Sequence, residues 1–348
     1  MSAVQASLEI TTPARDGSNQ IHSLPVLVLL PHNRCNCRCV MCDIWRIRQV
    51  REITASDLEG HRTSLRTLQV RWVVLSGGEP LMHSDLGALG RFFHEEGIRV
   101  TLLTAGLILE RYARMVAENV DDVIVSLDGP SEVHDSIRGI PRAFERLARG
   151  IEAVRKIRPV MPISARCTIQ KGNHLHLQAT LQAARRLGLN SISFLAADVN
   201  STAFNRPEGW TSDRQATVAL DANEVEELSR EIGSLLENYA QAVESGFVVE
   251  TAEKLRRVEK HFRARLGQLE AAAPLCNAPW VSAVIEADGN VRPCFFHPSL
   301  GSIHEGNLHS ILNSQQAIGF RASLDIATNP VCRRCTCSLN LNSHDGQP

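Results

Sequence analysis

Several features that assign a chain to a common class are missing from this 348-residue sequence. Its 37 basic and 38 acidic side chains leave a formal charge of −1, so no global field is available to hold a polyanion or an anionic membrane surface. Lysine is scarce, and no lysine lies in a recognisable motif, which leaves few candidates for a Schiff-base nucleophile: Lys156, Lys171, Lys254 and Lys260. We therefore expect neither a nucleic acid nor a membrane among the partners of this protein.

Long apolar runs and a secretory signal are missing as well. The longest apolar run near the N-terminus, residues 24–31, is far shorter than the roughly 18 residues that span a bilayer. The first twenty residues carry Glu9, Arg15 and Asp16 and no apolar segment. Ten cysteines are nevertheless present, in tight groups that are typical of metal ligands rather than of a secreted disulfide framework. We expect a soluble protein of the reducing cytoplasm.

Short apolar runs alternate with longer amphipathic runs over the first two hundred residues. Each apolar run indicates a strand buried on both faces, and the predicted strands are residues 26–30, 72–76, 100–104, 122–128, 163–170 and 191–196. The predicted helices between them are residues 56–68, 85–96, 110–118, 142–156 and 174–187. Because right-handed crossovers place each strand beside its predecessor, this order predicts an α/β fold with a parallel sheet that is closed or nearly closed into a barrel.

The composition divides the chain into four segments. Residues 1–22 are polar and aperiodic, which predicts a flexible N-terminal arm, and residues 23–212 form the barrel. Residues 213–270 carry apolar stripes of helical spacing, with Asn223 and Glu226 placed as a variant capping box. Residues 271–348 are rich in proline, glycine and cysteine, and Asp288-Gly289 marks a hairpin turn there. We expect this last segment to be a small second domain.

Polar and glycine-rich segments directly follow four of the predicted strands. They are residues 35–42, 77–80, 104–106 and 126–130. In parallel α/β folds the functional sites lie at the carboxyl ends of the strands. The sequence therefore places its functional site at this edge of the sheet.

Three cysteines in the first of these segments have the spacing Cys-x3-Cys-x2-Cys: Cys35, Cys39 and Cys42. Zinc sites and ferredoxin clusters usually take four protein ligands. Three thiolates in one short loop suit a cubane cluster that keeps one iron open to a substrate or cofactor. We interpret Cys37 as a non-ligand that points away from the cluster, although an exchange with a neighbouring ligand stays open.

This motif, together with Gly77-Gly78-Glu79-Pro80 after the second predicted strand, resembles the radical S-adenosylmethionine (radical SAM) superfamily over about residues 24–196. The resemblance implies a partial (β/α)6 TIM-like barrel whose 4Fe-4S cluster chelates SAM through its open iron. It implies an enzyme that cleaves SAM to methionine and a 5′-deoxyadenosyl radical, which abstracts hydrogen from a substrate. It also implies a reducing partner such as flavodoxin or ferredoxin.

The resemblance assigns part of the cofactor site to two loops. Gly77 and Gly78 allow a close backbone approach, and the Glu79 carboxylate accepts from the ammonium group of SAM. Met41 stands where the family often has an aromatic residue, and its backbone still serves the adenine. The loop after the third strand has Ala105-Gly106 where the family usually has Asn-Gly.

Four further side chains complete the expected SAM site. Ser126 and Asp128 stand where members of the family contact the ribose, although Asp128-Gly129-Pro130 is equally consistent with a plain turn. Either Arg138 or Arg166 pairs with the methionine carboxylate.

The C-terminal cysteines resemble the auxiliary-cluster extension of the same family. A hairpin supplies Cys276 and Cys294, and a later Cys-x2-Cys supplies Cys332 and Cys335. The cysteines are too few for the longer SPASM form, so we expect the short twitch form with one auxiliary 4Fe-4S cluster. Cys337 is an alternate ligand. A structural zinc knuckle with four thiolates is the other interpretation that this spacing permits.

The remaining candidates concern the chemistry on the substrate. An auxiliary cluster that accepts an electron makes a net oxidation possible, whereas an epimerisation needs a thiol to return a hydrogen atom. Cys167, Cys37 and Cys337 are the candidate thiols, although Cys167 is better explained as a small buried apolar residue. Other candidates at the exit of the sixth strand are Asp198 and Arg206, which orient or deprotonate a substrate hydroxyl, with His297 close to Cys294.

The sequence permits three interpretations of the function, two of which differ in the class of substrate. The arm before the first strand is too short for a peptide-recognition domain, which favours a small molecule such as a sugar, an aminocyclitol or a cofactor precursor. The second interpretation is a peptide-modifying maturase of the same superfamily, with recognition supplied by a separate protein. A non-catalytic iron-sulfur electron carrier is the third, but it does not explain the three-cysteine motif.

Overall fold

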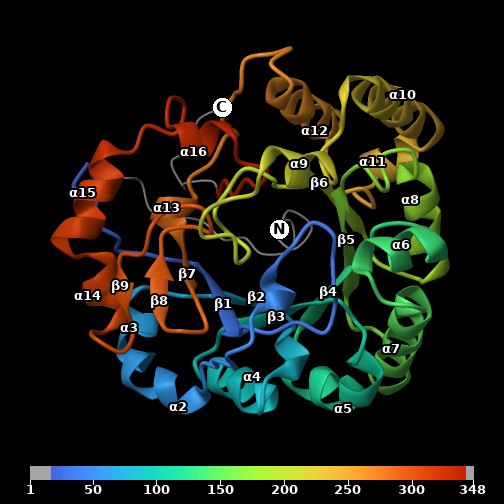
Figure 1. Ribbon diagram of the computed structural model, residues 1–348. Coiled ribbons are helices and arrows are strands. Elements are labelled where there is room, and N and C mark those ends of the chain that lie inside the picture. Colours follow the sequence, from blue (N-terminus) through green and yellow to red (C-terminus); the bar gives the residue numbers. More distant parts are fainter. Residues whose placement is uncertain (1–16, 342–348) are drawn as a thin grey trace.

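A computed structural model of the chain describes residues 17–341 (Figure 1). Six parallel strands follow one another in chain order across one sheet: β1 (Val26–His32), β2 (Trp72–Gly77), β3 (Arg99–Thr104), β4 (Asp122–Ser126), β5 (Ile163–Ile169) and β6 (Ile192–Ala196). All six predicted strands are therefore confirmed, with differences only at their ends. The sheet does not close, because β6 is its edge strand, and the fold is a partial barrel.

The cysteine-rich C-terminal segment continues this sheet instead of standing apart from it. Strand β7 (Ser282–Ile285) pairs in parallel with β1, and β8 (Asn290–Arg292) and β9 (Gly301–Ser302) follow antiparallel. The hairpin between β7 and β8 turns at Gly289, whose φ of +87° favours glycine. The expected small second domain thus shares one nine-stranded sheet with the barrel.

Helices cover the outer face of the sheet, as Figure 1 shows for α4, α5, α7 and α8. The helices are α2 (Ala55–Leu58), α3 (Arg62–Thr67), α4 (Leu86–Glu95), α5 (Leu109–Asn119), α6 (Ser131–Arg138), α7 (Ala143–Ile157), α8 (Leu177–Arg186), α9 (Ser212–Ala216), α10 (Ala222–Asn238), α11 (Ala240–Glu244), α12 (Ala252–Arg265), α13 (Ala278–Val281), α14 (Leu308–Leu312), α15 (Gln315–Ser323) and α16 (Pro330–Arg333), with 3₁₀ turns η1 (Ile44–Arg46), η2 (Glu59–His61) and η3 (Pro80–Met82). Within residues 17–341, no helix has the length and apolar character needed to cross a bilayer.

Two expectations about the helices need correction. The helix predicted over residues 56–68 is broken by η2 into α2 and α3, at a segment that contains Gly60. The capping box of α10 is made by Asp221 and Glu224, not by Asn223 and Glu226. Here Asp221 has the extended backbone that an N-cap residue needs, and its carboxylate accepts from the amide of Glu224 at 3.0 Å.

Two apolar clusters lie on opposite faces of the sheet. The outer cluster joins alternate strand residues, such as Leu27 and Val73, to the helices. The inner cluster takes the intervening residues, among them Val28, Val74 and Ile124, and Leu339 of the C-terminal segment packs against it. The inner face of β1, β2 and β4 is therefore filled with side chains, and the space for a ligand must lie nearer the carboxyl ends of the strands.

Candidate active site

The loop that carries the first three cysteines follows β1 and is fixed by the end of α6. The amides of Arg38 and Val40 donate to the carbonyl oxygens of Arg138 (2.9 Å) and Ile137 (3.1 Å). Gly139 ends α6 with a φ of +64°, and a Cβ atom there would lie 2.6 Å from the Arg38 carbonyl oxygen. A glycine is therefore required for the cysteine loop to lie against this helix.

The thiols of this loop lie together and are free. A hydrogen bond from the Cys37 thiol lowers the pKa of Cys39 to about 7, and the Arg138 guanidinium, 3.6 Å from Cys39 Sγ, acts in the same direction. Burial raises the pKa of Cys42 to about 12. Cys37 hydrogen-bonds both Cys35 and Cys39, so its side chain does not point away from the other thiols as expected. An exchange of ligands within this loop therefore stays open.

The two glycines after β2 let this strand approach the start of the cysteine loop. Gly77 has a φ of +106°, and a Cβ atom on Gly78 would lie 2.1 Å from the carbonyl oxygen of Arg34. The amide of Glu79 donates to that same oxygen at 2.8 Å. In this structure the close backbone approach of both glycines is to the chain itself, and it ties the β2 loop to the residue before Cys35.

The Glu79 carboxylate is fully buried at this junction. Its Oε1 accepts from Thr104 Oγ1 (2.7 Å) and the Leu81 amide (3.1 Å), and its Oε2 accepts from the Ala105 amide (2.8 Å). Burial raises the pKa of Glu79, whereas these three donors favour the charged form. A carboxylate has about four lone-pair positions, so one acceptor position at Oε2 is left for an ammonium group.

Asp128 and Arg138 form a buried ion pair beside the cysteine loop. Arg138 Nη2 lies 2.5 Å from Asp128 Oδ2, and the Thr168 amide donates to Asp128 Oδ1 at 2.9 Å. The other terminal nitrogen of Arg138 contacts Cys39 Sγ. The Asp128 amide also donates to His134 Nδ1 at 3.2 Å. The Asp128 carboxylate and the Arg138 guanidinium are thus already paired with groups of the chain, so few of their hydrogen-bonding positions are left for a ligand.

Arg166 differs from Arg138 in having no such partner. It pairs in register with Ser126, on the inner face of β5 and β4. Its Nε atom is buried and finds no hydrogen-bond partner within residues 17–341. A half-buried guanidinium that lies beside a hydroxyl and has no ion-pair partner among the described residues suits a ligand carboxylate. Cys167, by contrast, is fully buried in the outer cluster, on the opposite face of the same strand.

The segment after β6, residues 198–214, folds back over the cysteine loop; we call it the strap. Arg206 is buried, donates to the carbonyl oxygens of Asp198 (3.0 Å) and Met41 (3.3 Å), and faces the Asp198 carboxylate. That carboxylate also accepts from the amides of Asn200 and Ser201. Asp198 and Arg206, expected as substrate contacts, therefore hold the strap in place through most of their polar atoms.

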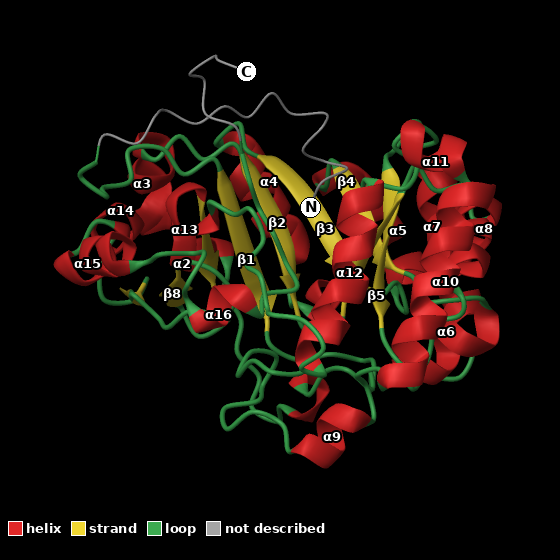
Figure 2. Cartoon of the chain, turned by 90° about the horizontal axis from the view of Figure 1, so that it is seen from above, coloured by secondary structure: helices red, strands yellow, loops and turns green. Residues whose placement is uncertain are grey.

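Further contacts bind the strap to the segment after Cys42. Trp210 Nε1 donates to Asp43 Oδ2 at 2.5 Å, and Arg214 Nη2 donates to the Val40 carbonyl oxygen at 2.7 Å. Both Arg206 and Arg214 stack on the Trp210 ring, with 4.1 and 4.6 Å from each guanidinium carbon to the ring centroid. Figure 2 shows α9, at the end of the strap, with its neighbouring loops beyond one end of the strands. Sequence reasoning expected only substrate contacts from Asp198 and Arg206 here and missed this role.

Replacing Trp210 with alanine is expected to loosen the cysteine loop. The change removes a hydrogen bond to a carboxylate and two cation–π contacts, together about 2–4 kcal/mol. We expect the iron bound after anaerobic reconstitution to fall by about half or more. Trp210→Phe keeps the ring and loses only the hydrogen bond, so it should give an intermediate iron content. Equal iron content in all three proteins would show that the strap does not support this loop.

Four C-terminal cysteines lie within electrostatic reach of one another. Burial raises the pKa of Cys294 to about 12, and Cys276 and Cys332 contribute in the same direction. Cys335 is likewise buried near Cys294 and Cys276. The Nε2 atom of His297 lies 3.4 Å from Cys332 Sγ. The four cysteines expected as auxiliary ligands therefore influence one another electrostatically.

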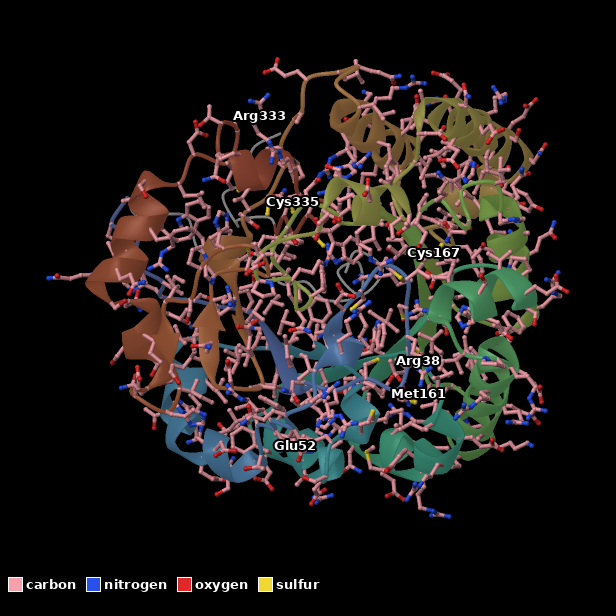
Figure 3. All side chains as sticks on the ribbon, in the orientation of Figure 1. Arg38, Glu52, Met161, Cys167, Arg333 and Cys335 are labelled. Atoms are coloured by element: carbon pink, nitrogen blue, oxygen red, sulfur yellow. The ribbon has the colours of Figure 1, made fainter. Side chains whose placement is uncertain are left out.

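Cys335, which Figure 3 labels, and Cys337 have different charged neighbours. Burial raises the pKa of Cys337, and the nearby charges that act on it belong to Arg166 on β5 and Asp198 on the strap. Arg257 of α12 donates to the Cys335 carbonyl oxygen at 3.0 Å. Cys335 and Cys337 are close neighbours, because the Cys335 thiol donates to the Cys337 carbonyl oxygen at 3.0 Å, but only Cys337 is acted on by Arg166 and Asp198.

Both groups of cysteines have the donor chemistry of iron-sulfur sites. All are free thiols, and the first group lies beside a guanidinium that stabilises thiolate charge. Among residues 17–341, no three or more cysteine, histidine or acidic side chains are arranged to hold a single metal ion. Three thiols in one loop suit a 4Fe-4S cluster that keeps one iron open to a further ligand. Four thiols in the C-terminal segment suit a cluster in which every iron has a protein ligand.

Comparison with known proteins agrees with this geometry. The family model described as the radical SAM superfamily matches residues 29–190, and the SPASM iron-sulfur cluster-binding domain matches residues 276–336. This chain belongs to the radical SAM superfamily and carries a C-terminal SPASM-type domain. Members of the superfamily are enzymes, and the cofactors are SAM, the 4Fe-4S cluster that binds it and an auxiliary iron-sulfur site.

Several curated proteins and solved structures are similar to the chain. An AdoMet-dependent heme synthase of Methanosarcina barkeri is 34% identical over 44% of this chain and 45% of its own length. A PqqA peptide cyclase of Ruegeria pomeroyi is 27% identical over 82% of this chain and 69% of its own length. The chain spans about half the length of the first of these relatives.

Among solved structures, Streptococcus suis SuiB bound to SAM has a TM-score of 0.63 at 14% identity, covering 92% of this chain and 74% of its own. Native anSMEcpe with bound AdoMet has a TM-score of 0.63 at 18% identity, covering 89% and 86%. At these identities the likeness concerns the fold alone.

Proposed function

We propose that this protein cleaves SAM reductively and uses the resulting radical to abstract hydrogen from a small-molecule substrate, such as a cofactor precursor. The observation that supports the proposal is the junction of the three-cysteine loop with Gly77-Gly78-Glu79: the amide of Glu79 donates to the carbonyl oxygen of Arg34, the residue before Cys35, and the Glu79 carboxylate has a spare acceptor position. When bound, the 4Fe-4S cluster supplies one electron to SAM, giving methionine and a 5′-deoxyadenosyl radical.

The residues that hold the cofactors follow from the contacts. Cys35, Cys39 and Cys42 hold the first cluster, and Glu79 accepts from the amino group of SAM. Of the two arginines considered for the methionine carboxylate, Arg166 is the better candidate, because Arg138 is already paired with Asp128. Cys276, Cys294, Cys332 and Cys335 hold the auxiliary cluster, with Cys337 left as a free thiol.

Replacing Arg166 with glutamine is expected to weaken the binding of SAM about tenfold or more, since a charge-assisted contact contributes about 1.5–3 kcal/mol. Equilibrium dialysis of labelled SAM against the reconstituted protein measures this affinity. Arg114→Gln removes the same charge from an exposed site on α5 and serves as the control. If both variants bind SAM as tightly as the unchanged protein does, Arg166 does not hold the carboxylate.

The proposed substrate class rests on the relatives that the chain resembles. The heme synthase relatives share a higher identity with this chain than the peptide cyclase does, which favours a small molecule. A peptide substrate is the second candidate, because the peptide cyclase match extends over most of the chain.

We also propose a small electron-transfer protein, flavodoxin or ferredoxin, as the reducing partner. We propose the cytoplasm as the location of the protein, since all ten cysteines are free thiols.

Metal analysis tests the cluster assignment. Anaerobic reconstitution with iron and sulfide is expected to give about eight irons per chain, the content of two cubanes. About four irons with one zinc would instead support the zinc knuckle and contradict the auxiliary cluster. Transfer of deuterium from labelled candidate substrates into 5′-deoxyadenosine then identifies the substrate and the position of the abstracted hydrogen. A labelled peptide that transfers deuterium where small molecules do not would establish the second candidate.

A further inference from the structure

Helix α12 lies at the open edge of the barrel, where it packs on β6. Leu255, Val258 and Phe262 form its buried apolar face. Arg257, His261 and Arg265 recur every fourth residue and share a neighbouring face; we call them the α12 strip. In Figure 1 the helix lies between β6 and α16, so it borders the gap that the open barrel leaves.

Two residues of the α12 strip, Arg257 and His261, have neighbours near the carboxyl ends of the strands. Arg257 is anchored near the auxiliary cysteines by its hydrogen bond to the Cys335 carbonyl oxygen. Burial lowers the pKa of His261 to about 4 and the Asp198 carboxylate opposes this change, so the ring lies within electrostatic reach of the strap. With a rise of 1.5 Å per residue, Arg257 and Arg265 stand about 12 Å apart along the helix.

The strip carries buried nitrogen atoms that no described residue satisfies. His261 Nε2 and Arg265 Nε have no hydrogen-bond partner within the described residues. The nearby Asp198 carboxylate is bound by Arg206 and by its own turn, and Glu259 on the same helix pairs with Arg263. An unsatisfied buried donor costs about 1–3 kcal/mol, so this arrangement is costly unless a ligand accepts from it.

We propose that Arg257, His261 and Arg265 form a subsite for an oxyanion of the substrate, either a carboxylate or a phosphate group. This subsite rests on the proposed function, because it takes the mouth of the barrel as the substrate entrance. Guanidinium groups bind both oxyanions through two parallel hydrogen bonds, and the imidazole adds one more donor. The α12 strip then holds the charged end of the substrate, and the reacting end lies inside the barrel.

Calorimetric titration of the reconstituted, SAM-loaded full chain with citrate and with inorganic phosphate, at constant ionic strength, tests the subsite. At least one anion is expected to bind, and Arg265→Gln and Arg257→Gln are each expected to weaken it about tenfold. Arg256→Gln removes the same charge from an exposed position of α12 and should leave the affinity within about twofold. Iron content and the thermal midpoint of each variant show whether it is folded and loaded.

The outcomes separate this inference from the proposed function. Tighter binding of citrate identifies a carboxylate, and tighter binding of phosphate identifies a phosphate group. Binding of neither anion, or an equal loss in all three variants, overturns the subsite. If the same unchanged protein still forms 5′-deoxyadenosine from SAM, the subsite alone is wrong. If it forms none although both clusters are intact, the proposed function fails independently of the titration.

Discussion

Replacing Cys39 with alanine is expected to abolish the formation of 5′-deoxyadenosine. This thiol is one of three in the first cysteine loop, and it is the one that contacts Arg138. Without it only two of the three assigned ligands remain, so the content after reconstitution should fall from about eight irons to about four. Chromatography with mass detection measures the product, and colorimetric iron analysis measures the cluster.

Cys167→Ala is the matched control for this experiment. Cys167 lies fully buried in the outer cluster, and its thiol contacts only Asn173 Nδ2, at 3.6 Å, among the hydrogen bonds of the described residues. We expect it to keep its full iron content. Product formation by Cys39→Ala at the level of the unchanged protein would contradict the assignment of this loop. Loss of product in Cys167→Ala with intact clusters would return that residue to the catalytic candidates.

The second large effect is expected at the auxiliary site. Replacing Cys332 with alanine should remove about four irons and stop turnover of the true substrate. Cleavage of SAM should persist, because Cys332 lies in the C-terminal segment and contacts His297, not the first cysteine loop. Separate assays of 5′-deoxyadenosine and of modified substrate measure the two effects. An unchanged iron content would show that Cys332 is not a ligand.

Cys337→Ala serves as the control for the auxiliary site. The charges near this thiol are those of Arg166 and Asp198, whereas Cys335 lies near Cys294 and Cys276. We therefore expect Cys337→Ala to keep about eight irons and Cys335→Ala to lose about four. The reverse result would make Cys337 the fourth ligand, an alternative that the spacing of the cysteines leaves open.

The strands and the cysteine groups could be predicted from the sequence because their signals are local. A strand buried on both faces appears as a short apolar run, and a cluster loop appears as a fixed spacing of thiols. The radical SAM resemblance came from two such local motifs, and the family comparison confirms it. The open edge at β6 agrees with the partial barrel that the resemblance implied.

The missed features depend on contacts between distant residues. Helix α6 is short, and five of its eight residues are charged or exposed, so it has no apolar stripe by which the sequence could predict it. Its role appears only when the Gly139 turn meets the Arg38 carbonyl oxygen. In the strap, Arg206 and Trp210 act on Met41 and Asp43, more than 160 residues earlier in the chain. Contacts between residues so far apart in the chain leave no periodicity or motif in the sequence from which they could be predicted.

The choice between Arg138 and Arg166 likewise could not be made from the sequence, because it depends on contacts between distant residues. Both are arginines near the carboxyl ends of strands, and the sequence assigns either to the methionine carboxylate. Only the structure shows that Asp128 already neutralises Arg138, whereas Arg166 has no ion pair with a described residue. A buried charge pair resists recruitment by a ligand, because breaking it leaves an uncompensated charge at a cost of about 3–5 kcal/mol.

The most direct test of the central claim is the product of SAM under reducing, anaerobic conditions. The reconstituted protein is mixed with SAM and dithionite. The products are separated by chromatography, and 5′-deoxyadenosine and methionine are quantified by mass spectrometry. We expect 5′-deoxyadenosine and methionine in equal amounts, with neither formed by Cys39→Ala. Absence of 5′-deoxyadenosine from a protein that carries about eight irons would contradict the assignment of this chain as a radical SAM enzyme.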